Sequence, residues 1–161
     1  MRGPLLFSGL LLLCGTVLLA APPPPKLFDA DGKAVDFERR FGKRQRVLIF
    51  AGLGTPAEQA MLDLVQENIK RIRSAERSSV AVVFVAMTPR QADDYCRGRE
   101  YEFPWLCDPS GSWLGPLGID FLPTLIVQSP EGQTRYRTTA LSAPLIRSVV
   151  RHPEQTPGPS R

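Results

Sequence analysis

The sequence predicts one α/β domain in which a β-sheet lies between two layers of helices. Continuous apolar runs at residues 46–52 and 79–86 are typical of buried strands, and the second favours a central parallel strand. A segment with helical spacing of its apolar residues connects the two runs, as a crossover requires. A third run, at residues 122–128, is followed by a turn signal and a short strand, which predicts a hairpin.

Length and composition indicate an ordinary globular protein. The chain has 161 residues, which is enough for one domain with a proper core but not for two. Hydrophobic residues make up 43% and charged residues 22%. The net charge of +4 is small, which argues against a dedicated nucleic-acid-binding protein.

Residues 1–21 predict a secretory signal. Arg2 is the single charge, residues 5–19 are apolar, and Ala20 and Ala21 are small enough for a signal peptidase. One alternative is a retained membrane anchor, because the prolines that follow are an awkward flank for cleavage. Another is a lipoprotein acylated at Cys14, which the bulky residue before it disfavours. We expect an exported protein that would meet a membrane only through a retained anchor.

The exported part has three predicted sections. Residues 22–26 are rich in proline and predict a stiff spacer. The domain follows at residues 27–152, and residues 153–161 predict a disordered tail because they are polar and without apolar periodicity.

The first long helix has a well-marked start. Thr55 is the expected N-cap, Pro56 occupies the first helical position, and Glu58 stands where a capping box needs it. One apolar face is expected from Met61, Leu64, Val65, Ile69 and Ile72.

The other elements are read from turn signals and apolar runs. A hairpin is predicted at Asp31-Gly32, with Val35 and Phe37 alternating after it. The remaining elements are a helix from Thr88-Pro89 to about Arg99, an extended piece at 103–107, turns at 108–111 and 129–132, an edge strand at 134–138, and a last helix at 142–151.

Three motifs in the second half of the chain resemble a known family. They are FPWLCDPSG at residues 103–111, GIDFLPTLIV at residues 118–127 and PEG at residues 130–132. With the element order, they resemble the thioredoxin-like redoxins, which include TlpA-type reductases and peroxiredoxins. The resemblance covers residues 27–150 and implies a thioredoxin-like three-layer domain, whose mixed sheet has four or five strands and helices on both faces.

The resemblance also implies a binding loop. In the family a cis proline lies beside the active cysteine, and the residue before it offers backbone groups to an extended substrate. Here these positions are Pro123 and Leu122, so we expect a cis bond between them and candidate binding residues at Thr55, Leu122, Pro123 and Thr124. The alternative is an ordinary trans proline at the start of a strand.

The sequence departs from the family where the nucleophilic cysteine belongs. Pro56 fits a Cys-x-Pro-Cys arrangement, but Gly54 and Ala57 occupy the two cysteine positions. A one-residue shift places Thr55 and Glu58 there instead. A helix N-terminus activates a thiol by lowering its pKa, and neither alignment supplies one. We therefore expect a degenerate site without catalytic residues.

Cys96 and Cys107 are the two cysteines outside the signal. Three interpretations stand: a structural disulfide, two buried unpaired thiols, or a relocated redox-active pair.

His152 is the sole histidine, so neither a zinc site nor a hydrolase triad is expected, and no cofactor is expected. The GLGT sequence at 52–55 is a weak dinucleotide signal, although free N–H groups at the following helix would suit an anion.

The one basic cluster is residues 39–46. It predicts a solvated loop or, alternatively, a docking surface for an acidic partner or an anionic membrane.

Two hypotheses for function follow. The first is an exported non-catalytic domain, with the bacterial periplasm as the preferred compartment, that binds or scaffolds a partner protein at the groove around Thr55 and Leu122-Pro123. The alternative is a diverged thiol-disulfide oxidoreductase that uses Cys96 and Cys107.

Overall fold

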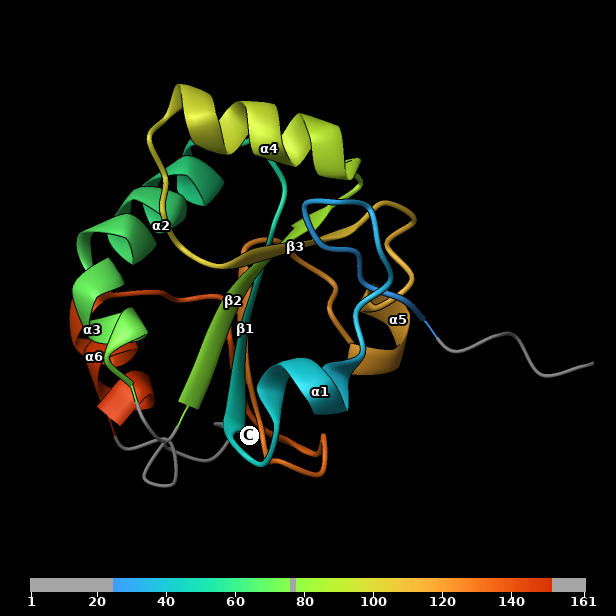
Figure 1. Cartoon of the computed structure of the whole chain (residues 1–161). Helices are drawn as coiled ribbons and strands as arrows, with labels where there is room; N and C mark the ends of the chain where they lie inside the picture. The colour runs from blue at the N-terminus through green and yellow to red at the C-terminus, as the bar shows by residue number, and fades with distance from the viewer. Residues whose placement is uncertain (1–24, 76–77, 152–161) are drawn as a thin grey trace, which may run out of the picture.

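The computed structural model describes residues 25–75 and 78–151, so the predictions for residues 1–21, for most of the spacer at 22–26, for residues 153–161 and for His152 lie outside it. One five-stranded sheet has the strand order β3-β2-β1-β4-β5 (Figure 1). The strands are β1 (Gln45–Ala51), β2 (Ser78–Val85), β3 (Trp105–Asp108), β4 (Thr124–Gln128) and β5 (Thr134–Thr138). The helices are α1 (Phe37–Phe41), α2 (Pro56–Glu67), α3 (Ile69–Arg73), α4 (Pro89–Gly98), α5 (Leu114–Leu117) and α6 (Ala143–Arg151).

The sheet is mixed, as predicted. β1, β2 and β3 run parallel to one another, whereas β4 is antiparallel to both β1 and β5. β5 is an edge strand, in agreement with the sequence analysis, and most of its side chains are exposed. The predicted hairpin of the last two strands is therefore confirmed.

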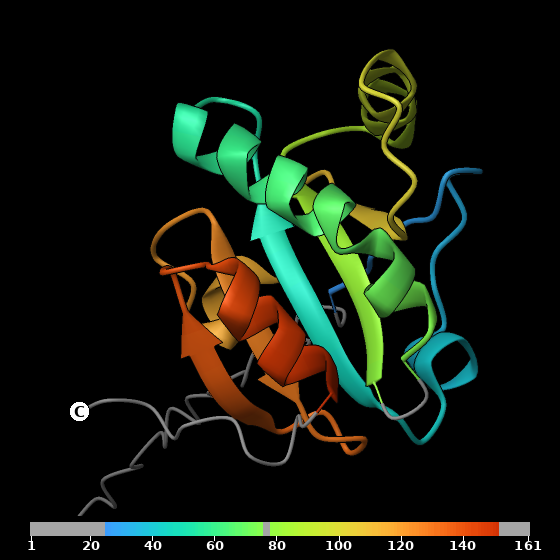
Figure 2. The ribbon, with the colours of Figure 1, turned by 90° about the vertical axis from the view of Figure 1, so that its left-hand side faces the viewer.

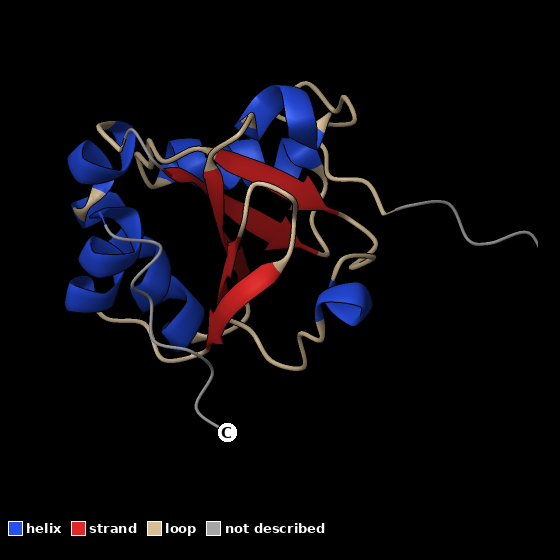
Figure 3. Ribbon diagram, turned by 90° about the horizontal axis from the view of Figure 1, so that it is seen from below, coloured by secondary structure: helices blue, strands red, loops and turns tan. Residues whose placement is uncertain are grey.

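Two hydrophobic cores lie on opposite faces of this sheet. Val47 and Ile49 of β1 point into one core, and Leu48 and Phe50 point into the other. Buried residues of α2, α3, α4 and α6 complete the first core, whereas α1, α5 and the segment at Leu27 cover the second. Figures 2 and 3 show these helices on both sides of the sheet, which confirms the three-layer prediction. No helix within residues 25–75 and 78–151 is long and apolar enough to cross a bilayer.

The first long helix begins as predicted, but it ends before Ile69 and Ile72, which were expected to continue its apolar face. α2 ends at Glu67 and the shorter α3 follows, with Asn68 between them. Asn68 is buried, and its side-chain amide donates to the Leu64 carbonyl oxygen at 2.9 Å. Side-chain amides compete in this way with the helical ladder. Ile69 still packs in the same core as α2, so the predicted apolar face survives the break.

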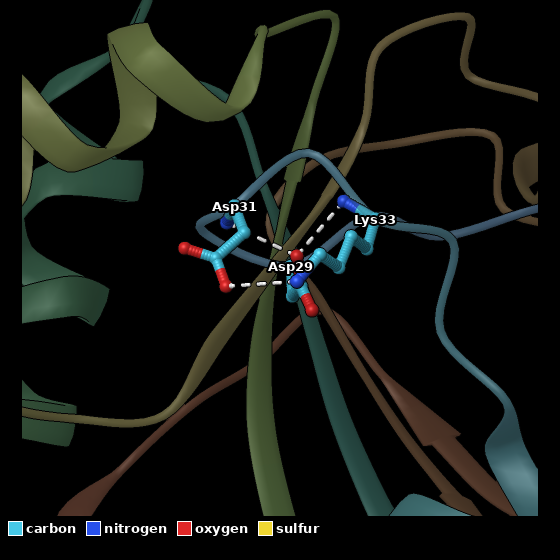
Figure 4. Close-up of polar contacts among 3 residues, drawn as sticks. All are labelled: Asp29, Asp31 and Lys33. Carbon is cyan, nitrogen blue, oxygen red and sulfur yellow. Dashed lines mark hydrogen bonds and ion pairs between the residues drawn. The ribbon is translucent and has the colours of Figure 1, made fainter.

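The predicted hairpin at Asp31-Gly32 is present, but its second strand is shorter than expected. Phe28 bridges to Ala34, and Figure 4 shows the turn between them. Phe37 does not continue the strand; it begins α1 instead. The reason is Asp36, whose Oδ1 accepts a hydrogen bond from the Arg39 N–H at 3.1 Å and so caps the helix.

Differences in the second half arise around β3. The extended piece predicted at 103–107 is a strand that pairs with β2 and with Phe28. The turn that follows it is present, with the Gly111 N–H bonded to the Asp108 carbonyl. The fully buried Asp108 carboxylate also accepts the Ser112 and Trp113 N–H groups at 2.9 and 2.8 Å, leading the chain into the unpredicted α5. β4 begins at Thr124, two residues later than predicted.

Candidate functional site

The candidate site lies at the end of the sheet where β1 stops and β4 starts. The antiparallel register pairs Phe50 with Thr124. The segment after β1 therefore leaves the sheet at the same end at which Leu122-Pro123 enters it. The Leu122–Pro123 peptide bond is cis. The structure thus brings together at one sheet end the two groups of residues that the sequence analysis proposed as a groove.

The start of α2 is a complete capping box. The Thr55 Oγ1 accepts the Glu58 N–H at 3.2 Å, and the Glu58 Oε2 accepts the Thr55 N–H at 2.8 Å. Pro56 stands in the first turn, where its missing N–H costs nothing. This part of the site was predicted from the sequence and is confirmed.

Glu58 does more than close that box. Its side chain is buried, with a residue exposure of 4%. Its Oε1 accepts the Gly52 N–H at 2.7 Å, and its Oε2 also accepts the Gly54 N–H and the Thr55 hydroxyl, each at 3.0 Å. One carboxylate thus receives three backbone N–H groups and a hydroxyl, at the helix end that favours negative charge. The negative charge at the N-terminus of α2 is therefore supplied by a side chain of the protein itself, Glu58.

This arrangement corrects the expectation that free N–H groups here would suit an external anion. The Gly52 and Gly54 N–H groups already bind Glu58, and a phosphate would meet its negative charge. The weak dinucleotide signal at 52–55 is therefore wrong.

Gly52 is a site residue that was noted in the sequence only as part of the dinucleotide signal at residues 52–55. A Cβ at this position would lie 2.8 Å from the Glu58 Oε1, closer than real Cβ contacts come. Glycine is thus what allows the carboxylate to approach the backbone. The signal in the sequence was a glycine six residues before a buried helical glutamate.

Under the first of the two alignments proposed above, the positions expected to hold cysteines lie at the surface, whereas under the shifted alignment Thr55 is exposed and Glu58 is buried. Gly54 and Ala57 are both exposed. A Cβ at Gly54 would contact the Glu58 Oε2 at 3.8 Å, an ordinary van der Waals distance. The position therefore has room for a side chain, and its present residue simply brings no nucleophile.

Two large apolar side chains are exposed at this end of the sheet, and the sequence analysis missed both. Leu53 is 40% exposed and Phe121 is 75% exposed. Leu53 follows β1, and Phe121 precedes the cis bond. The buried Thr124 holds the second loop, because its hydroxyl donates to the Phe121 carbonyl oxygen at 2.5 Å. We use the name Leu53–Phe121 surface for four residues of the two segments that meet this sheet end, Leu53, Thr55, Phe121 and Leu122.

Cys96 and Cys107 are buried, free thiols in the same core. Burial raises the pKa of both to about 12, and the nearby Asp93 and Cys107 also raise the pKa of Cys96. Cys107 is level with Ala51 in the sheet, but Phe84 of β2 lies between them. The structure therefore does not bring the thiols to the Leu53–Phe121 surface.

Metal ligands do not gather in the described part of the chain. No three His, Cys, Asp or Glu side chains among residues 25–75 and 78–151 are placed to hold an ion.

Comparison with known proteins identifies the fold. No protein-family model matches the chain, and no curated protein matches it. Among solved structures, StoA from Bacillus subtilis superposes with a TM-score of 0.64 at 16% identity, over 79% of this chain and 98% of that one. The chain has a thioredoxin-like fold.

Two further thioredoxin-like structures show the same likeness. The exposed lipoprotein thioredoxin Etrx1 from Streptococcus pneumoniae has a TM-score of 0.64 at 21% identity, over 78% of this chain and 96% of that one. A secreted disulfide oxidoreductase from Mycobacterium tuberculosis has a TM-score of 0.62 at 14% identity, over 78% and 92%. Identities this low support the fold alone, and the fold implied by the redoxin resemblance is confirmed.

Proposed function

We propose that this chain is an exported, non-catalytic thioredoxin-like domain that binds an extended segment of a partner protein at the Leu53–Phe121 surface. The observation that carries the proposal is the Glu58 carboxylate on the N–H groups at the start of α2. In a redoxin that helix end would stabilise a thiolate. Here it has no thiol and is already occupied by a negative charge.

The exposed apolar side chains support binding at the same place. Leu53 and Phe121 belong to the two segments at this sheet end, and burying an exposed aromatic or leucine side chain stabilises a complex by about 1.5 to 3 kcal/mol. Leu122 adds backbone groups at the start of β4, where an extended segment would pair as an added strand does.

Export is part of the proposal. It rests on the apolar segment at residues 5–19 and its small-residue end. Two structural neighbours are described as an exposed lipoprotein and a secreted protein, which supports the same compartment class. The bacterial periplasm is our preferred location.

Burial weighs against the alternative, an oxidoreductase that uses Cys96 and Cys107. Thiol–disulfide exchange requires an accessible thiolate, whereas both thiols are buried and have a pKa of about 12. A structural disulfide between them stays a prediction.

Site-specific photocrosslinking tests the proposal. A photoreactive residue replaces Phe121 in the full chain, and a second protein carries it at Gln133, which is exposed in the β4–β5 connection at the other end of the sheet. We expect discrete crosslinked partners from position 121 and none of the same mass from position 133. Leu53→Ser should lower the yield from position 121. Equal crosslinking from positions 121 and 133, or a yield from position 121 that Leu53→Ser does not lower, would contradict the proposal.

A further inference from the structure

A second candidate site lies at the opposite end of the sheet, where β1 and β2 begin. A pocket of about 300 Å³ is lined there by Arg40 of α1, Arg44 of the turn after α1 and Arg73 of α3. Figures 1 and 2 both place α1 and α3 at this end of the sheet. The fold thus gathers three guanidinium groups that are up to 33 positions apart in the sequence.

The described lining of this pocket carries positive charge only. Arg40 and Arg44 are exposed, and neither forms an ion pair within residues 25–75 and 78–151. Arg73 is held in place by Glu102, through an ion pair at 3.2 Å and a hydrogen bond to the Glu102 carbonyl at 2.8 Å. Arg73 is therefore oriented but partly neutralised, whereas Arg40 and Arg44 are unopposed by any described ion-pair partner.

Two carboxylates near Arg40, those of Asp29 and Asp31, form hydrogen bonds and an ion pair within their own turn. Arg40 also lines a neighbouring pocket, together with Asp29 and Asp31. The Asp29 Oδ1 accepts the Asp31 and Lys33 N–H groups at 3.0 and 2.9 Å, and Asp31 is ion-paired with Lys33 at 3.8 Å (Figure 4). These interactions stay within the turn, and neither Asp29 nor Asp31 lines the arginine pocket.

The rest of the lining suits a small polar ligand. Ser79 of β2 is half-buried and brings a hydroxyl, which can donate one hydrogen bond. Phe41 and Ile72 also line the pocket, but both are buried and offer little apolar surface to a ligand. The pocket is at the lower end of the size range of small-ligand sites.

We propose that this pocket binds a phosphate group. Guanidinium groups bind phosphate oxygens through paired, charge-assisted hydrogen bonds, and several arginines can share one group of three oxygens. Arg40 and Arg44 supply charge that no described ion pair neutralises, Arg73 is held by Glu102, and Ser79 supplies a neutral donor. This site is separate from the Leu53–Phe121 surface and does not depend on the function proposed for it.

A titration of the full chain with inorganic phosphate tests the site. Backbone amide signals of Arg40, Arg44 and Ser79 are followed by NMR, with sodium chloride at matched ionic strength as the reference. We expect saturable shifts with phosphate alone. Arg40→Gln together with Arg44→Gln should weaken binding at least about tenfold, because each removes a charge-assisted contact. The matched control is Arg39→Gln, which removes an exposed arginine of α1 outside the pocket lining and should leave the affinity within about twofold.

A vesicle arm distinguishes a free phosphate compound from a lipid headgroup. Sedimentation with phosphatidylglycerol vesicles is compared between the parent chain and the double variant, which share the same apolar N-terminal segment. Loss of sedimentation in the double variant assigns the phosphate to a headgroup, and equal sedimentation assigns it to a soluble compound. The proposal is overturned if phosphate shifts are not saturable, if chloride reproduces them, or if Arg39→Gln weakens binding as much as the double variant.

Discussion

Glu58 shows how one side chain can change the chemistry of a strand-to-helix junction. A strand followed by a helix N-terminus leaves several N–H groups pointing at one place. In this chain the Glu58 carboxylate fills that place and accepts three of them. The same hydrogen bonds that hold the loop after β1 therefore also remove the environment that would activate a thiol.

Glu58→Gln should destabilise the fold by about 2 to 3 kcal/mol, because charge-assisted bonds to several buried N–H groups are lost or weakened. Urea unfolding of the variant measures the change. Glu67→Gln is the matched control, since Glu67 is an exposed residue at the end of the same helix, and it should change stability by less than about 0.5 kcal/mol. Equal effects of the two variants would mean that the Glu58 hydrogen bonds matter little.

Cys96 and Cys107 should react slowly with alkylating reagents in the reduced native protein. Their pKa of about 12 leaves little thiolate near neutral pH. We expect alkylation at about pH 8 to be more than about 100-fold slower than in the urea-unfolded chain, as measured by mass spectrometry. A fast-reacting thiol in the native state would show that one of them is accessible.

The same burial gives a pH dependence with a definite sign. A buried thiol keeps its proton in the folded chain at a pH where the unfolded chain loses it, so its contribution is complete below the unfolded pKa of about 8.5. It is lost as the pH rises from there towards 12. The unfolding free energy of the reduced protein should therefore fall more steeply over this range than that of Cys96→Ser with Cys107→Ser. If the unfolding free energies of the two proteins fell equally with pH, the raised pKa of the buried thiols would be contradicted.

At the scale of elements, local signals predicted much of the fold. The starts of α2 and α4 were readable because Thr55 and Thr88 each precede a proline and a box residue three positions on, and both boxes are present. β1 and β2 were readable from unbroken apolar runs that lie between two helical layers. These features depend on neighbours in the sequence, which is why the sequence alone reveals them.

Elements that depend on distant contacts were not predictable in the same way. β3 is only four residues long and is defined by its pairing with β2. α5 and the break at Asn68 follow instead from local side-chain hydrogen bonds, those of Asp108 and of the Asn68 amide. Both side chains are buried by the assembled fold, which the local sequence does not reveal. The exposure of Leu53 and Phe121, likewise, is a property of the assembled sheet end and not of either segment.

The start of α2 can be tested as an element by giving it thiols. Gly54→Cys with Ala57→Cys creates a Cys-x-Pro-Cys sequence at positions with room for the side chains. We expect the thiol at position 54 to keep a pKa of at least about 8.5, because the adjacent carboxylate disfavours a thiolate and holds the N–H donors. Adding Glu58→Gln should lower that pKa by about one unit or more, as followed by thiolate absorbance. An already lowered pKa in the double variant would show that Glu58 does not block the site.

At the scale of the whole molecule, the sheet separates two surfaces of different character. One end, where α2 follows β1, carries Leu53 and Phe121, and the other end carries the arginine pocket. The sequence analysis found the basic segment at 39–46 and the loop at Leu122-Pro123. It could not place Arg73 with the first or Leu53 with the second, because only the strand register and the helix crossings bring them together.

Thiol-independent capture of a partner is the most direct consequence of this account. The measurement is the crosslinking yield from position 121 in the full chain, compared with the same chain carrying Cys14→Ser, Cys96→Ser and Cys107→Ser. We expect equal crosslinking yields from the two proteins, and no reduction of a disulfide substrate by either protein. Partner capture or disulfide reduction that disappears with the cysteines would contradict this expectation.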